Sequence, residues 1–170
     1  MEKLIIYQKA SNFREKVLTK MVGLLNPIYI ALMPRNRAWK LTKADLGRFP
    51  KGSLGRDLSN FLDENKFDLL PYLETHDVYH VLLGYKPTII EESRMYFFLL
   101  GNGKRSFEVI NTVLISLVLL PEYWSDLFSH FHRGKACKNI SKWDFRYLMH
   151  EETSVLRGIL NNNVEAKFFV

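Results

Sequence analysis

The sequence predicts one all-α domain of about seven helices, spanning residues 1–170. Three observations support this class. Apolar residues recur at helical spacing through most of the chain, glycine and proline punctuate the segments between them, and no alternating strand pairs with hairpin turns occur. At 170 residues, with 47% hydrophobic and 14% aromatic content, the chain is long and apolar enough for a packed globule.

The first half of the chain predicts three helical segments. Residues 11–25 place apolar side chains at helical spacing, and residues 42–46 predict one short helical turn. A breaker-rich turn at 50–56 leads into an amphipathic helix over 57–65.

Two helices follow, over 71–83 and 89–101. Gly84 suits the left-handed position at a helix C-terminus, and a proline soon after it cannot continue the helix. The string Thr88-Ile89-Ile90-Glu91 predicts a capping box that starts the second helix, with its glutamate reaching back to the cap.

The last helices are expected over 106–120, from Pro121 to near Gly134, and over 141–160. Residues 106–120 are apolar almost all round, which predicts a buried helix, the wall of a lipid groove or tunnel, or contact with a membrane surface. The segment is short of the ~20 residues that a membrane-spanning helix needs. Residues 17–33 are interrupted by polar residues and a proline, so neither segment is expected to span a bilayer.

Charge and cysteine content bound the setting of the protein. A net charge of +6 indicates attraction to polyanions, but the basic residues are scattered and form no nucleic-acid motif. We therefore expect no nucleic-acid partner and favour an anionic membrane face. Cys137 is the single cysteine, so no intramolecular disulfide can form, which fits a reducing compartment. Residues 1–20 contain no apolar signal-peptide region, and their glutamates are atypical of transit peptides, so a cytoplasmic location is expected.

The string His76-Asp77-Val78-Tyr79-His80, followed twelve positions later by Glu92, is the main candidate site. On a helix the two histidines lie one turn apart on one face, and Asp77 borders that face. The break at Gly84 would let Glu92 face them from the next helix. Two imidazoles and two carboxylates form a ligand set typical of divalent metals. The metal site is therefore predicted at His76, Asp77, His80 and Glu92, which would act in catalysis through the metal.

Other interpretations of this string remain open. Paired histidines one turn apart occur by chance on solvated helices, and Asp77 replaces the glutamate of the H-E-x-x-H metalloproteases. An HD-type phosphohydrolase would need further ligands on other helices. The remaining histidines, His130, His132 and His150, form no recognisable set.

Two parts of the chain resemble the Coq-four family of ubiquinone-biosynthesis proteins. The turn Pro50-Lys51-Gly52-Ser53-Leu54-Gly55-Arg56 with Phe61-Leu62-Asp63 resembles one family element. The string from His76 to Gly84, with eleven residues between His80 and Glu92, resembles the family's metal signature. Gly134-Lys135-Ala136, Trp143, Leu148 and Arg157 look like its closing helices, so the resemblance covers residues 45–160.

The resemblance implies a helical, lipid-associating protein that holds a divalent metal, usually zinc. Iron, manganese or cobalt would also suit imidazole and carboxylate ligands. It implies a role in coenzyme Q assembly, at the step that replaces the carboxyl group of a polyprenylated benzoate ring by a hydroxyl. It also implies peripheral attachment to a membrane and association with other quinone-biosynthesis enzymes. The residues favour a bacterial setting, on the inner face of the membrane.

Three functions follow as hypotheses. The first is a metal-dependent enzyme, an oxidative decarboxylase of a prenylated aromatic acid. The second is a non-catalytic scaffold that binds an isoprenoid lipid or quinone precursor, and a homo-oligomer is compatible with either. The third is a metal-dependent hydrolase of phosphorylated isoprenoids. Lys86, Tyr79 and Arg94 are candidates for binding a carboxylate or supporting the metal, and the turn at Arg56 is a candidate anion site.

Overall fold

The structure, a computed structural model, describes residues 38–161 of the 170-residue chain. The described residues contain no strand beyond one isolated bridge, so the all-α class is confirmed. The expected helix over 11–25 and the apolar segment 17–33 lie outside the described residues. The elements are α2 (Lys43–Leu46), α3 (Leu54–Asn65), α4 (Glu74–Leu83), α5 (Ile89–Gly101), α6 (Phe107–Leu119), the 3-10 helix η2 (Pro121–Tyr123), α7 (Trp124–Ala136), the 3-10 helix η3 (Phe145–Leu148) and α8 (Thr153–Leu160).

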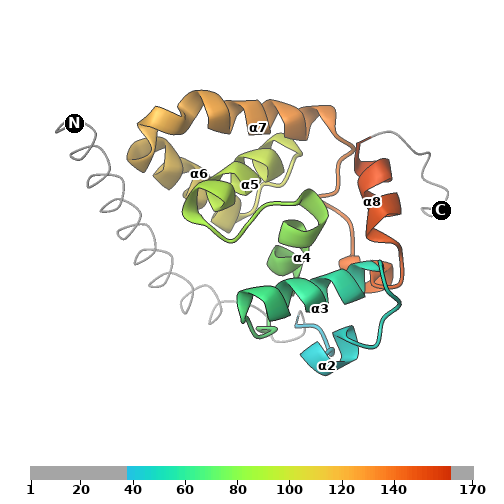
Figure 1. Cartoon of the computed structure of the whole chain (residues 1–170). Coiled ribbons are helices and arrows are strands. Elements are labelled where there is room, and N and C mark those ends of the chain that lie inside the picture. Colours follow the sequence, from blue (N-terminus) through green and yellow to red (C-terminus); the bar gives the residue numbers. More distant parts are fainter. Residues whose placement is uncertain (1–37, 162–170) are drawn as a thin grey trace, which may run out of the picture.

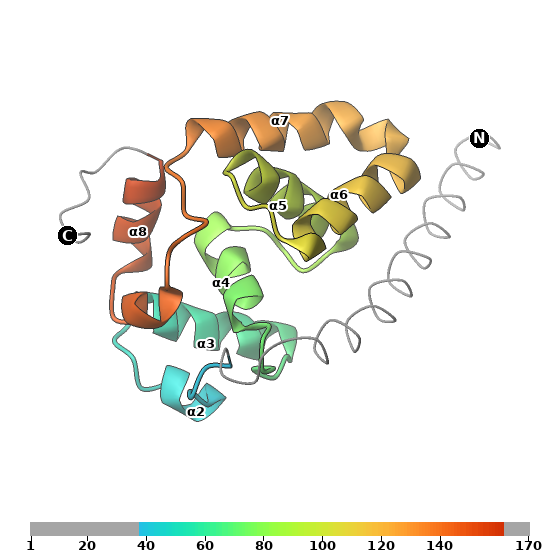
Figure 2. The same cartoon turned by 180° about the vertical axis from the view of Figure 1, so that it is seen from behind.

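Helix α4 lies in the middle of the molecule (Figure 1). Helices α2 and α3 lie on one side of it, and α5, α6 and α7 lie on the other, with α8 along one edge; the reverse view agrees (Figure 2). Two groups of buried apolar side chains match this division. The larger packs around α3, α4 and α8, and the smaller, formed by Phe97, Val113, Leu120 and Leu127, lies between α5, α6 and α7.

Helices α5 and α7 pack in close contact because each contributes a glycine to the crossing. A Cβ atom on Gly101 would lie 2.0 Å from the carbonyl oxygen of Phe131, and one on Gly134 would lie 2.1 Å from that of Phe98. The sequence placed the end of α7 near Gly134, and the helix ends within two residues of it. The helix continues to Ala136, because the absence of a side chain at position 134 serves the packing and not the helix end.

The prediction of one helix over 141–160 is wrong. Only η3 and α8 form there, because local polar groups and distant backbone groups take the hydrogen bonds that a continuous helix would need. The Asp144 side chain accepts from the backbone of Arg146, and the carbonyls of Met149 and Glu151 accept from the start of α3. The intervening segment therefore ties α8 to α3.

The glycine-rich turn before α3 has a structural role. Gly52 has a φ of 79°, a left-handed conformation that favours glycine. The side chain of Ser53 accepts from the backbone N–H of Arg56, so α3 begins at Leu54, earlier than the predicted residue 57. The Arg56 side chain donates to the carbonyl of Phe49, which gives this arginine a partner within the turn.

Helix α6 presents an apolar face to solvent. Phe107, Ile110, Leu114 and Val118 follow helical spacing and are 75%, 43%, 57% and 77% exposed. Its opposite face is buried in the smaller core, so the helix is apolar on both sides. Among residues 38–161, no single helix is long and apolar enough to cross a bilayer. Helix α6 and the segment 121–136 together reach that length and hydropathy, but they are bent by 102°.

Candidate metal centre

The link between α4 and α5 brings the candidate ligands together. Gly84 ends α4 with a φ of 77°, as the sequence predicts, and the chain turns before α5 begins at Ile89. Arg157 of α8 secures the end of α4, because its guanidinium donates to the carbonyls of Val81 and Leu82. The last turn of α4 and the first turn of α5 therefore face one another across a short link.

The predicted capping box at the start of α5 does not form. Thr88 occupies the N-cap position, but no side-chain hydrogen bond caps the helix there. Glu91 instead pairs with Arg94 one turn later, since a guanidinium is a stronger partner for a carboxylate than a backbone N–H. Glu92, the next residue, is left to face α4.

Three ligand atoms converge at this point. His80 Nε2 lies 3.1 Å from His76 Nε2 and 3.0 Å from Glu92 Oε1. The third pair, His76 Nε2 and Glu92 Oε1, lies 3.6 Å apart. One ligand atom from each residue thus falls within 4.8 Å of the others, and no other group of three such residues occurs in the described part of the chain.

His80 is fixed on every side. It is 3% exposed, and its ring stacks on Phe61 of α3 with 5.3 Å between centroids and 14° between planes. Its Nδ1 lies 3.0 Å from the backbone carbonyl of Tyr85. Because a carbonyl only accepts hydrogen bonds, Nδ1 of His80 carries a proton. Its Nε2 points towards His76 and Glu92.

His76 is held more loosely and lies nearer the surface. Its side chain is 28% exposed, and that of Glu92 is 27% exposed, so the centre is accessible from their side. The hydroxyl of Tyr96 lies 3.3 Å from His76 Nδ1, and the two rings lie 6.0 Å apart. Tyr96 follows Glu92 by four positions, which places both on the same face of α5.

The ionisation states of His80 and Glu92 depend on one another. Burial by itself would raise the pKa of Glu92, but hydrogen bonds with His76 and His80 outweigh it and lower the pKa to about 2. Burial by itself would lower the pKa of His80, yet Glu92 and the Tyr85 carbonyl raise it. The cluster thus favours an ionised carboxylate beside a positive charge.

Asp77 is not one of the three converging residues, although it shares their electrostatic environment. Burial raises its pKa to about 6, against the attraction of His76 and His80, and Glu92 adds repulsion. A carboxylate with a raised pKa among these groups adds negative charge to the centre above about pH 6. Its predicted role as a fourth ligand stays a prediction.

The other predicted supporting residues have other surroundings. Tyr79 lies against Lys104, whose ammonium is 4.6 Å from the ring centroid. Arg94 pairs with Glu91 and, at 2.7 Å, with Asp126 of α7. The backbone carbonyl of Tyr85 and the hydroxyl of Tyr96, both absent from the sequence prediction, are polar groups outside the cluster that contact its two imidazoles. Tyr96 lies four positions after Glu92, and this helical spacing was the sequence signal that could have identified it. A backbone carbonyl in a turn leaves no such signal in the sequence.

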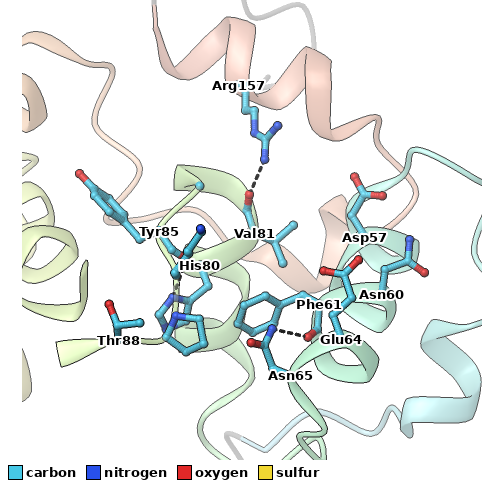
Figure 3. A pocket seen from close by; sticks show the side chains of 13 residues that line it. Asp57, Asn60, Phe61, Glu64, Asn65, His80, Val81, Tyr85, Thr88 and Arg157 are labelled. Carbon is cyan, nitrogen blue, oxygen red and sulfur yellow. Dashed lines mark hydrogen bonds between the residues drawn. The ribbon is translucent and has the colours of Figure 1, made fainter. Parts of the chain in front are cut away.

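A cleft of about 610 Å³ lies beside the centre, between α3 and the link (Figure 3). His80 is the one converging residue that lines it. Polar side chains dominate its wall on α3, which differs from the apolar lipid groove that the sequence suggested. Asp57, Asn60, Phe61, Glu64, Asn65, Val81, Tyr85, Lys86, Thr88 and Arg157 are among its lining residues.

The fold and the site define an all-α protein with a cluster of two histidines and one carboxylate, at the point where a short link joins α4 to α5. No protein-family model matches the chain, and no curated protein matches it. Its fold is similar to that of a crystal structure from Nostoc punctiforme PCC 73102, described as a "Putative ubiquinone biosynthesis protein". The TM-score is 0.55 at 20% sequence identity, over 91% of this chain and 82% of that chain. This likeness establishes a shared fold.

Proposed function

We propose that the protein binds a divalent metal through His76, His80 and Glu92, with Asp77 alongside, and acts in ubiquinone-type biosynthesis on a prenylated aromatic acid. The observation that carries this proposal is the convergence of two imidazole nitrogens and one carboxylate oxygen. Metal–ligand bonds of about 2.0–2.1 Å place neighbouring ligand atoms about 2.9 to 3.4 Å apart in octahedral or tetrahedral geometry. The separations of 3.1, 3.0 and 3.6 Å lie close to that range.

The hydrogen bond made by His80 Nδ1 supports a cation between Nε2 of the same ring and Glu92. Because its Nδ1–H is directed at the Tyr85 carbonyl, a neutral ring turns the Nε2 lone pair towards the carboxylate of Glu92. Two lone pairs 3.0 Å apart repel unless a proton or a metal ion lies between them. An imidazole that ligates a metal through one nitrogen usually donates a hydrogen bond from the N–H of its other nitrogen to a carbonyl or carboxylate. The donor set therefore fits a resident metal.

Each residue has a definite task in this proposal. A divalent metal, with zinc the first candidate, would supply a Lewis acid able to bind the carboxylate of the aromatic substrate. His80 and its buried surroundings fix the orientation of the site, and the partly exposed side of His76 and Glu92 leaves room for the substrate. Three protein ligands would leave a position open, as catalytic sites require.

The biosynthetic part of the proposal is supported by two observations. The first is the resemblance of the strings around Gly52 and His76 to the Coq-four family. The second is the shared fold with the Nostoc punctiforme protein. The specific step we propose is oxidative replacement of the ring carboxyl group by a hydroxyl. The ring–carboxyl bond breaks and CO₂ leaves, while dioxygen is the two-electron oxidant and water supplies the hydroxyl oxygen, so that ArCOOH + O₂ + H₂O gives ArOH + CO₂ + H₂O₂.

Elemental analysis of the purified protein, followed by titration of the metal-free protein with Zn²⁺, tests the metal site. We expect one equivalent to bind and His80→Ala to abolish binding. Product formation from a prenylated hydroxybenzoate then separates the two roles. If His80→Ala remains folded and loses turnover, the protein is an enzyme; if metal removal unfolds it and no turnover is found, the metal is structural and the protein a scaffold. A wild-type protein that binds no divalent metal would refute the proposal.

We also propose that the apolar face of α6 contacts the surface of a lipid bilayer. Four aliphatic or aromatic side chains project from one stripe, and no charged residue lies between Glu108 and Glu122. Trp124 at the start of α7 is 47% exposed, and its indole N–H donates to the carbonyl of Leu117. An amphipathic ring of this kind is typical of membrane interfaces. The stripe would also give a prenylated substrate a route from the bilayer.

Co-sedimentation with vesicles tests this surface. We expect binding to vesicles that contain anionic lipid, and at least a tenfold loss in the double variant Leu114→Asp/Val118→Asp. Tyr147→Asp is the matched control, because Tyr147 is 80% exposed but lies on η3, outside the stripe. Equal loss in the control, or no binding by the wild type, would refute the lipid contact and leave the metal proposal untouched.

A further inference from the structure

The carbonyl that fixes His80 lies in the non-helical link between α4 and α5. Tyr85 follows Gly84, the C-cap of α4, and α5 begins only at Ile89. A carbonyl beyond the helix lacks the ladder of bonds that fixes carbonyls within it. The side chain of Tyr85 is therefore its main anchor. Tyr85 is only 5% exposed, and the centroid of its ring lies 6.4 Å from that of Phe98.

The Tyr85 hydroxyl is held by α7. It lies 2.7 Å from His130 Nδ1, and a guanidinium nitrogen of Arg133 lies 3.4 Å from it. Burial lowers the pKa of His130 despite the opposing pull of Asp126, which favours the neutral ring. A neutral ring accepts a hydrogen bond from the Tyr85 hydroxyl at Nδ1, and its Nε2 lies 3.8 Å from Asp126 Oδ1, beyond hydrogen-bond distance.

The same helix face also reaches the first turn of α5. The second oxygen of Asp126 accepts from Arg94 Nε at 2.7 Å, and Arg94 pairs in turn with Glu91. These two residues lie on either side of Glu92 in the sequence of α5. Asp126 and His130 are one helical turn apart on α7, so one face of α7 contacts both segments that present the candidate ligands.

We propose that His130 is a positioning residue for the metal centre. Through Tyr85 it holds the carbonyl that orients His80, while Asp126 on the same face of α7 steadies, through Arg94, the turn of α5 that presents Glu92. This inference rests on the proposed metal site and adds a residue on a third helix to it. Neither His130 nor Tyr85 contributes an atom to the metal.

Metal affinity and coordination geometry test this role together. The full-length metal-free protein is titrated with Zn²⁺ against a chromogenic chelator, and with Co²⁺, whose visible spectrum reports its coordination geometry. We expect His130→Ala and Tyr85→Phe each to lower the Zn²⁺ affinity about tenfold, as loss of outer hydrogen bonds does at other sites. Both variants should also change the Co²⁺ spectrum. His130→Gln, whose amide oxygen accepts from the Tyr85 hydroxyl, should restore most of the affinity and the wild-type spectrum.

His132→Ala is the matched control, because this histidine lies on the same helix and is exposed. It should bind both metals like the wild type. Tyr85→Phe removes one hydroxyl and keeps the ring, so it decides the question if His130→Ala does not fold. Wild-type affinity and spectrum in Tyr85→Phe would overturn this inference alone. A wild-type protein that binds neither metal would overturn it together with the proposed metal site.

Discussion

His80 Nε2 lies 3.0 Å from Glu92 Oε1, across the turn that joins two helices. With the other nitrogen of His80 directed at a carbonyl, this contact needs a positive charge between the two atoms. In the metal-free protein a proton supplies that charge, and in the proposed holoprotein a metal ion does. The competition between the two makes stability and metal binding depend on pH in opposite ways.

The metal-free protein should gain most from this pair in mildly acid solution. The pKa of His80 is raised above 6.5, so its contribution is complete below pH 6.5 and is lost as the pH rises through the folded-state value. The pKa of Glu92 falls from 4.5 to about 2, so its contribution is present above pH 4.5 and is lost as the pH falls towards 2. Thermal unfolding of the chelator-treated protein from pH 4 to 9 should show a maximum between these limits. A Glu92→Gln profile that keeps only the fall contributed by Asp77 between pH 4 and above 6 would assign the maximum to the pair, and an unchanged profile would contradict the assignment.

Stabilisation by Zn²⁺ should instead grow with pH. Each metal ion must displace the proton shared by His80 and Glu92, so binding weakens below the pKa of His80. Calorimetry in buffers of different ionisation enthalpy should therefore detect proton release at pH 6 and less at pH 8. Metal binding of equal strength at both values, without proton release, would mean that the ion binds elsewhere.

Glu92→Gln should lower the Zn²⁺ affinity by about 100-fold or more, because an amide oxygen is a neutral and weaker ligand than a carboxylate. The metal-free variant should also lose about 1–3 kcal/mol of unfolding free energy as buried His80 loses its charged partner. Glu64→Gln is the control, an exposed glutamate that lines the neighbouring cleft. Chelator competition and urea unfolding measure the two effects, and similar losses in both variants would remove Glu92 from the site.

Asp77→Asn should stabilise the metal-free protein at neutral pH. Burial raises the pKa of Asp77 to about 6, so the fold prefers the protonated form and is penalised as the pH rises from 4 to above 6. Removing the charge should raise the unfolding free energy at pH 7.5 by about 1–2 kcal/mol and change it little at pH 4. The same substitution should weaken Zn²⁺ binding, by loss of a ligand or of nearby negative charge. Destabilisation at pH 7.5 would contradict the raised pKa.

Gly134→Ala should destabilise the protein by about 3 kcal/mol, through separation of α5 and α7. The new Cβ would lie 2.1 Å from the carbonyl oxygen of Phe98, which is backbone and cannot move aside cheaply. Gly47→Ala is the control. Its φ is −64°, and a Cβ there would meet no atom closer than 3.5 Å, so its unfolding free energy should change by less than about 0.5 kcal/mol. Equal stability of the two variants would show that the crossing can relax.

The sequence by itself determined the helices whose boundaries depend on local chemistry. Gly84 ends α4 because a left-handed residue is cheapest without a side chain, and the spacing of His76 and His80 places them on one face. The resulting α4, α5 and α6 match the predicted segments within about three residues. The convergence of Glu92 with both histidines followed from the same break.

Tertiary structure decided the rest, because those outcomes depend on partners far away in the sequence. Gly134 carries no sign that it serves a helix crossing. Residues 141–152 form no α-helix, and the carbonyls of Met149 and Glu151 there accept from the start of α3. Likewise, Arg94 takes Glu91 away from its predicted cap, and His130 reaches Tyr85 across 45 positions. Local spacing fixes which residues share a face of one helix, whereas packing between helices selects the partner that each polar group finally contacts.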